Sequence, residues 1–156
     1  MSVVIAHTAA PPYLRETARV LHEADLLRLA VIGLATRDDD LWMRAISSIP
    51  GLGQLHALFR RKRFEEVPRA KLRRRGRYEL ARLVCGRLDR LGIATDYLWD
   101  QGTKRFDRYS ASVLRPGDTA YGYEYGCLAF LNKPGNLATP RCTRSPVRHM
   151  TGITIC

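Results

Sequence analysis

The sequence predicts an α/β protein with a Rossmann-like parallel sheet and flanking helices. Two observations carry this prediction: short apolar runs alternate with amphipathic helical segments, and a loop rich in glycine and tyrosine follows the last run. A βαβ unit opens the chain. Residues 2–6 are typical of a buried strand, residues 12–24 place Leu14, Ala18 and Leu21 on one helical face, and residues 29–34 predict a second strand.

The later segments predict helices and then one more strand. Three aspartates at residues 38–40 indicate the start of a short helix that runs to residue 46, and residues 55–59 predict another. Residues 78–91 show the most regular leucine stripe, and Gly92 is expected to end that helix. Residues 105–114 predict a short helix, residues 119–121 a strand, and residues 127–131 the start of a buried helix.

Length and composition limit the class of protein. The 156 residues suffice for one domain, or one domain with a tail, and 46% hydrophobic residues suffice for an ordinary core. No segment approaches the run of about 18 apolar residues that a membrane-spanning helix needs. The N-terminus lacks a secretory pattern, so we expect a cytoplasmic location. The four cysteines show no metal-ligand spacing, and we expect no metal and no cofactor on this chain.

The formal net charge of +11 favours an anionic partner. Between residues 60 and 77 the chain carries ten Lys or Arg residues against two glutamates. We expect seven of them to contact an anion or a membrane: Arg60, Arg61, Lys62, Arg63, Arg73, Arg74 and Arg75. A lipid surface, nucleic acid and a solvated face without a partner all remain open, although no known nucleic-acid module fits. The lipid interpretation places four apolar side chains in the membrane interface: Leu52, Leu55, Leu58 and Phe59.

Two polar residues follow predicted strands and are candidate ligand contacts. His7 ends the first strand, and Glu124 lies in the loop Tyr121-Gly122-Tyr123-Glu124-Tyr125-Gly126 after the last strand. Because ligands collect at the carboxyl ends of parallel strands, we expect both side chains to open into one crevice. There Glu124 would accept hydrogen bonds from sugar hydroxyls, and Tyr123 or Tyr125 would offer a ring face. The alternative is that each residue only satisfies local backbone.

The segments Val3-Val4-Ile5-Ala6-His7-Thr8, residues 17–27, Phe106-Asp107 and the loop at residues 121–126 carry a family resemblance. Over about residues 2–131 the chain resembles the N-terminal domain of bacterial group 1 (family 4) glycosyltransferases of GT-B architecture. The resemblance implies an acceptor-binding domain whose C-terminal partner domain binds a nucleotide-sugar. It also implies that His7 and Glu124 face the cleft, with Thr8, Tyr123 and Tyr125 beside them. The chain departs from the family in having no pair of glutamates eight positions apart and no glycine-rich loop after the first strand.

The resemblance divides the chain into residues 1–131, a partial Rossmann-like glycosyltransferase N-terminal domain, and residues 132–156, an irregular basic tail. A disordered tail, a truncated chain and a shifted reading frame would each explain the tail. The abrupt loss of pattern as a helix begins favours the shifted frame.

We therefore expect a fragment of a glycosyltransferase of polysaccharide biosynthesis that contributes the acceptor-side domain and is inactive alone. Its partners would be a nucleotide-sugar, a saccharide or lipid-linked acceptor and a separate C-terminal domain, with peripheral contact at the inner face of the membrane. The alternatives are a non-enzymatic basic α/β module that binds anionic lipid or nucleic acid, and the N-terminal subunit of a split transferase.

Overall fold

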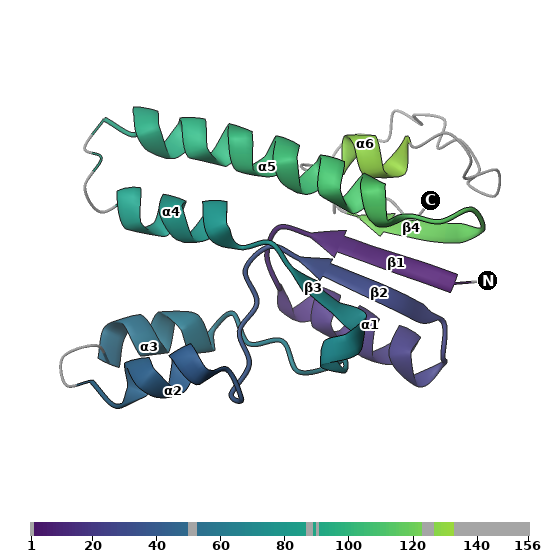
Figure 1. Cartoon of the computed structure of the whole chain (residues 1–156), viewed down its shortest axis with the longest axis horizontal. Helices are drawn as coiled ribbons and strands as arrows, with labels where there is room; N and C mark the ends of the chain where they lie inside the picture. Colours follow the sequence, from purple (N-terminus) through teal and green to yellow (C-terminus); the bar gives the residue numbers. More distant parts are fainter. Residues whose placement is uncertain (1, 50–52, 87–88, 90, 123–126, 133–156) are drawn as a thin grey trace.

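A computed structural model describes residues 2–49, 53–86, 89, 91–122 and 127–132 of the chain. Over these residues the chain forms a four-stranded parallel sheet in the order β3-β2-β1-β4 (Figure 1). The strands are β1 (Ser2–His7), β2 (Leu27–Ile32), β3 (Leu72–Arg74) and β4 (Asp118–Gly122). The expected α/β class, with a parallel sheet and flanking helices, is confirmed.

The helices cover both faces of the sheet. Helix α1 (Pro12–Glu23) lies on one face, and α5 (Ile93–Val113) and α6 (Leu128–Leu131) lie on the other (Figure 1). Helices α2 (Leu41–Ser47) and α3 (Gly53–Arg60) pack on each other, and a short 3-10 helix, η1 (Arg69–Lys71), leads into β3. Helix α4 (Arg77–Cys85) packs against α5 beyond the carboxyl ends of the strands.

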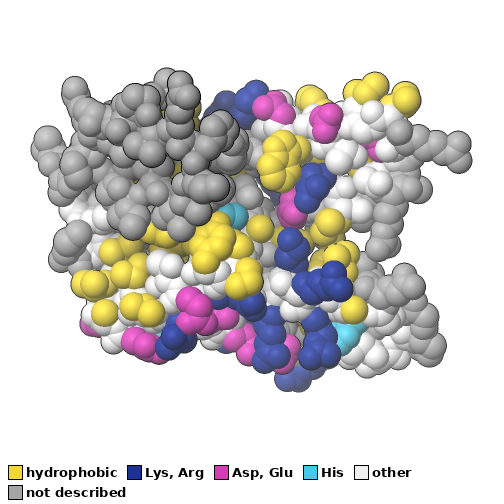
Figure 2. Space-filling view, turned by 180° about the vertical axis from the view of Figure 1, so that it is seen from behind, with side chains coloured by type: hydrophobic (Ala, Val, Ile, Leu, Met, Phe, Trp, Pro, Cys, Tyr) yellow, Lys and Arg dark blue, Asp and Glu magenta, His cyan; other side chains and the backbone are white. Residues whose placement is uncertain are grey.

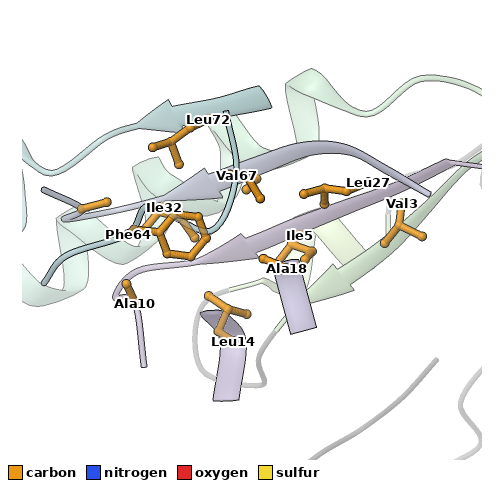
Figure 3. Packing of buried hydrophobic residues seen from close by; sticks show 12 residues of the cluster. Val3, Ile5, Ala10, Leu14, Ala18, Leu27, Ile32, Phe64, Val67 and Leu72 are labelled. Atoms are coloured by element: carbon orange, nitrogen blue, oxygen red, sulfur yellow. The ribbon is translucent and has the colours of Figure 1, made fainter. Parts of the chain in front are cut away.

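The apolar run of β1 buries side chains on both faces. Val3 and Ile5 join the cluster under α1, which also contains Leu14 and Phe64 and is drawn in Figure 3. The alternate residues, Val4 and Ala6, join the second cluster with Phe106 and Phe130 from α5 and α6. Because a parallel sheet is covered on both sides, its inner strands are continuously apolar, and this pattern made β1 and β2 recognisable in the sequence.

Strand β3 was not predicted from the sequence. Residues 72–74 pair with residues 30–32 of β2, so a segment expected to be only a basic surface forms the edge of the sheet. Leu72 is buried, whereas Arg73 and Arg74 carry charge along the edge. Three residues with one apolar side chain give no strand periodicity, and charged residues are a common protection of sheet edges.

The prediction of one helix over residues 78–91 is wrong in its second half. Helix α4 ends at Cys85, and Leu91, expected on its apolar stripe, is 83% exposed. Gly92 begins the next helix and has a left-handed backbone with φ 78°. The Asp89 carboxylate accepts the N–H groups of Gly92, at 3.0 Å, and Thr95, at 2.8 Å, which turns the chain into α5. The helix expected at residues 105–114 is thus the end of a 21-residue helix.

A buried ion pair joins the amino ends of the strands, at the edge away from the carboxyl ends. Asp118 accepts hydrogen bonds from Arg28 Nε at 2.9 Å, Ser2 Oγ at 2.6 Å and the Arg115 N–H at 2.7 Å. Burial alone would raise the pKa of Asp118, but the hydrogen bonds, first that of Arg28, outweigh it and lower this pKa below 3.8. The pair fixes β1, β2 and β4 at one end of the sheet.

Candidate functional site

A pocket opens at the carboxyl ends of three parallel strands. Thr8 follows β1, Gly33 follows β2 and Arg75 follows β3, and all three line it. The remaining lining residues come from α4 and α5: Tyr78, Glu79, Arg82, Leu98, Trp99, Gly102, Thr103 and Phe106. The carboxyl edge of an open parallel sheet is where α/β proteins of this kind bind ligands.

Two glycines let the walls of the pocket come together. A Cβ atom on Gly33 would lie 2.1 Å from the Thr8 carbonyl oxygen, so only glycine permits the loop after β1 to lie against the end of β2. The N–H of Leu34 donates to that same oxygen at 3.2 Å. On the opposite wall, a Cβ atom on Gly102 would lie 2.8 Å from Cβ of Tyr78, so glycine brings α5 close to α4.

Arginines and aromatic rings supply the chemistry of the pocket. The Arg75 guanidinium lies 3.9 Å from the centre of the Tyr109 ring, and the Arg82 guanidinium lies 5.1 Å from that of Trp99. Arg82 also donates two hydrogen bonds to Glu79, at 3.0 and 2.7 Å. The hydrogen bonds to Glu79 raise the pKa of Arg82, so this charge is compensated. Arg75 has no acidic partner among the described residues.

His7 ends β1 as expected and organises the loop that follows. The N–H of Ala9 donates to Nδ1 of His7 at 2.9 Å, and Nε2 lies 3.2 Å from the hydroxyl of Tyr13. Because Nδ1 accepts, the proton of the neutral ring is on Nε2 and is donated to Tyr13. Burial lowers the pKa of His7, and the charge of Lys62 lowers it further. The neutral imidazole therefore holds the loop that presents Thr8 to the pocket.

Tyr123, Glu124 and Tyr125 lie outside the described residues. Gly122, the last residue described before them, pairs with Ala6 of β1 in the parallel register. Strands β1 and β4 are therefore neighbours whose carboxyl ends point to the same edge of the sheet. The crevice expected between His7 and Glu124 stays a prediction, and the described pocket lies at the ends of β1, β2 and β3.

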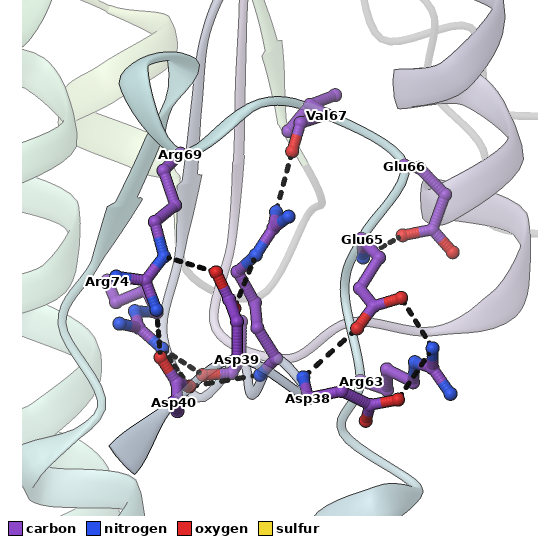
Figure 4. A network of polar contacts seen from close by, with 11 residues as sticks. Asp38, Asp39, Asp40, Arg63, Glu65, Glu66, Val67, Arg69 and Arg74 are labelled. Carbon is purple, nitrogen blue, oxygen red and sulfur yellow. Dashed lines mark hydrogen bonds and ion pairs between the residues drawn. The ribbon is translucent and has the colours of Figure 1, made fainter.

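The seven basic residues expected to contact an anion have different environments. Arg63 forms ion pairs with Asp38, at 2.8 Å, and with Glu65 (Figure 4). Arg74 pairs with the buried carboxylate of Asp40, which also accepts from Arg69 at 2.8 Å. Helix α2 begins directly after the three aspartates, as expected, and the Asp40 carboxylate links its start to η1 and β3 through Arg69 and Arg74.

The other basic residues keep their charge uncompensated. Arg60, Arg61 and Lys62 at the end of α3, and Arg73 on β3, have no acidic partner in the described part of the chain. Figure 2 shows Lys and Arg side chains gathered with Asp and Glu side chains along the lower part of the visible face. Residues 60–77 therefore form a mixed surface of ion pairs and unpaired cations. Arg75 belongs to the same segment but lines the pocket.

The apolar residues expected to enter a membrane interface differ from those that are exposed. Phe59 is 3% exposed and packs with Leu34 and Met43. Leu52 lies outside the described residues, as does the side chain of Leu55, and Leu58 is half-buried. On α2 and just after it, Leu41 is 80% exposed, and Trp42 and Ile49 are also exposed.

Sequence reasoning missed the α4 and α5 wall of the pocket. Tyr78, Glu79 and Arg82 lay in the helix predicted over residues 78–91 from its leucine stripe, and residues 93–104 were not assigned. A signal was present on α5, because Trp99, Thr103 and Phe106 stand at i, i+4 and i+7, which places them on one helical face.

Among the described residues no group of three or more His, Cys, Asp or Glu side chains could hold a metal ion. No helix in that part of the chain is both long and apolar enough to cross a membrane. Comparisons of the chain with protein-family models, with curated proteins and with solved structures found no match. The fold and site thus define a Rossmann-like α/β protein with a pocket at the carboxyl edge of its sheet.

Proposed function

We propose that the chain is the acceptor-side domain of a glycosyltransferase and binds the edge of a saccharide at the small pocket, about 20 Å³, lined by Thr8, Gly33, Arg75, α4 and α5. In this proposal a C-terminal domain binds the nucleotide-sugar, and the acceptor is a saccharide or a lipid-linked saccharide. The observation that carries the proposal is the position and lining of the pocket: aromatic rings and polar side chains meet at the carboxyl ends of parallel strands.

The lining suits a sugar ring, which has apolar C–H faces and a rim of hydroxyls. Trp99 is 46% exposed and, with Tyr78, offers ring surface for stacking. The hydroxyls of Thr8 and Thr103 make no hydrogen bond within the described part of the chain, so both are available to a ligand. The Glu79 carboxylate, held by Arg82, can accept from a sugar hydroxyl.

The proposal assigns recognition to these residues and leaves the transfer step to the complete enzyme. Enzymes of the family that the sequence resembles recognise the donor with their C-terminal domain. We therefore expect the isolated chain to bind a saccharide without turnover. Binding, measured directly, is the property that tests the assignment.

Saturation-transfer NMR with a panel of mono- and disaccharides gives this test. The chain contains two tryptophans, and only Trp99 lines the pocket, so Trp99→Ala and Trp42→Ala form a matched pair. We expect saturation transfer to a saccharide with the natural chain and with Trp42→Ala, and its loss with Trp99→Ala. Equal transfer with both folded variants, or none with the folded natural chain, would contradict the proposal.

A second candidate function is binding to an anionic membrane surface, and one observation favours it. Exposed Leu41, Trp42 and Ile49 accompany Arg44 and Arg60, neither of which has an acidic partner among the described residues. Exposed apolar side chains beside free cations match a lipid interface, where each basic residue contributes about 1 kcal/mol near an acidic surface.

Vesicle sedimentation separates this candidate from the first. If α2 and α3 contact lipid, binding should rise with the fraction of phosphatidylglycerol and fall with salt, and Trp42→Ala should weaken it more than Trp99→Ala. The order of the two variants is therefore opposite to that expected for the saccharide. Equal binding to neutral and anionic vesicles removes this candidate, and tight, sequence-selective binding to RNA or DNA would replace lipid with nucleic acid.

A further inference from the structure

We infer that the pocket recognises an anionic group, a phosphate or a carboxylate, through Arg75. The inference rests on the proposed function in one respect, namely that a saccharide carries this group. The anion site itself depends on the charges around Tyr78 and on the position of Arg75.

Positive charge dominates this side of the pocket. The guanidinium groups of Arg77 and Arg105 each lie 5.2 Å from the centre of the Tyr78 ring, and Arg75 and Arg82 line the same pocket. The lining itself contains two arginines, Arg75 and Arg82, and one carboxylate, Glu79. Both oxygens of Glu79 accept from Arg82, so this acid does not compensate the other arginines. A ligand that brings negative charge would reduce this excess.

Arg75 is held in a geometry that leaves its donors available. Its backbone N–H donates to the carbonyl oxygens of Ile32, at 3.0 Å, and Gly33, at 3.2 Å, which fixes the residue at the end of the sheet. Its guanidinium carbon lies over the Tyr109 ring, 3.9 Å from the ring centre. Its side-chain N–H groups make no hydrogen bond to a described residue, so they can donate to a phosphate or a carboxylate.

Arg74 and Arg75 are neighbours in the sequence, but Arg74 forms an ion pair and Arg75 lines the pocket. Side chains alternate along an extended segment, so neighbouring residues point to opposite sides. Arg74 reaches the buried carboxylate of Asp40, while Arg75 lines the pocket without an acidic partner among the described residues. Thr8 and Thr103 add two hydroxyls that can donate to the same anion.

Fluorescence titration of the Trp42→Phe chain tests the inference, because Trp99 in the pocket is then the remaining tryptophan. The probes are glucose, glucose 1-phosphate and inorganic phosphate. We expect glucose 1-phosphate to bind at least about tenfold more tightly than glucose, the size of one charge-assisted hydrogen-bonded contact. Arg75→Gln should remove this preference, so that glucose 1-phosphate binds no more tightly than glucose. Arg108→Gln, an exposed arginine of α5 outside the pocket, should keep it.

The outcomes separate the inference from the proposed function. Equal binding of glucose and glucose 1-phosphate overturns the anion site and leaves the saccharide site standing. Phosphate binding that requires Arg75, without any gain from the sugar, supports the anion site and contradicts the saccharide. A second readout needs no substitution at Arg75: its side-chain Nε–H NMR resonance should move when phosphate is added, and a resonance that stays fixed overturns the inference.

A further arm identifies the source of the anion. If a lipid headgroup supplies it, phosphatidylglycerol vesicles should bind the chain in a way that depends on Arg75 and is displaced by glucose 1-phosphate. If a free sugar phosphate supplies the anion, neither the substitution of Arg75 nor the addition of glucose 1-phosphate should change vesicle binding. For a chain that binds glucose 1-phosphate through Arg75, the first result assigns the anion to a lipid headgroup and the second to a free sugar phosphate. Displacement by glucose 1-phosphate that does not depend on Arg75 contradicts the anion site.

Discussion

Replacing Asp118 by asparagine should destabilise the protein through the ion pair at the amino ends of the strands. The asparagine side chain would keep the size of the aspartate but lose the charge that accepts both nitrogens of Arg28. Removing one partner of a buried pair costs about 3–5 kcal/mol. Because the Arg28 side chain is 22% exposed and can be partly hydrated, the lower end applies, about 3 kcal/mol.

A thermal melt followed by circular dichroism measures this loss. For a chain of this length each kcal/mol lowers the Tm by about 3 °C, so Asp118→Asn should melt about 9 °C below the natural chain. Asp100→Asn is the matched control, since Asp100 pairs with Lys104 on the exposed surface of α5. Such an exposed pair contributes at most about 0.5 kcal/mol, and its loss should move the Tm by no more than about 2 °C.

The pH dependence gives the same prediction a second test. The folded-state pKa of Asp118 lies below its unfolded value, so the stabilisation is fully present above about pH 4. It is lost as the pH falls through the folded pKa, because the unfolded chain then binds the proton more readily. The difference in stability between the natural chain and Asp118→Asn should therefore shrink below pH 4. Equal Tm values for Asp118→Asn and Asp100→Asn at neutral pH would refute this account of the sheet edge.

Two further predictions concern the loops around the pocket. Gly33→Ala should destabilise the fold and weaken ligand binding, because the new Cβ would clash with the Thr8 carbonyl. Gly53→Ala is the control and should be neutral or stabilising, since no atom lies within 4 Å of its Cβ. Equal melting temperatures for the two variants would count against the close approach of Gly33 and Thr8. The lowered pKa of His7 predicts that the free energy of unfolding falls as the pH drops from 6.5 through the folded pKa. In urea titrations between pH 7 and pH 5, His7→Gln should flatten the dependence of this free energy on pH. An unchanged dependence would show that His7 does not titrate in this range.

The sequence predicts those parts of the fold that local pattern determines. Strand β1 and residues 29–32 of β2 are apolar runs, and α1 presents Leu14 and Ala18 at helical spacing toward the sheet, so each could be recognised from its own residues. The expected bounds of the second strand, 29–34, are two residues late, because β2 begins at Leu27 and ends at Ile32. Strand β3 could not, because its pairing with β2 depends on the tertiary position of three residues of which two are arginines. The split between α4 and α5 was hidden because it depends on the Asp89 carboxylate and the left-handed Gly92.

The candidate site was predictable only in its location. The carboxyl edge of the sheet follows from parallel topology, and the family resemblance implied that Thr8 lies beside the cleft there. The second wall depends on contacts between residues distant in sequence. Gly102 must meet Tyr78, and Arg75 must stack on Tyr109, before α4 and α5 can face the strand ends. Composition indicated an anionic partner but could not distinguish Arg75 from the neighbouring Arg74, which forms an ion pair.

The most direct test of a saccharide site in this pocket is a titration followed at the two tryptophan side chains. Each indole N–H gives its own resonance in a ¹H–¹⁵N spectrum, one from Trp99 in the pocket and one from Trp42 on α2. With a panel of free and phosphorylated saccharides, we expect the Trp99 resonance to shift in a saturable way while that of Trp42 stays fixed. A saturable shift of Trp42 alone, or no shift of either resonance in the folded protein, would contradict the account.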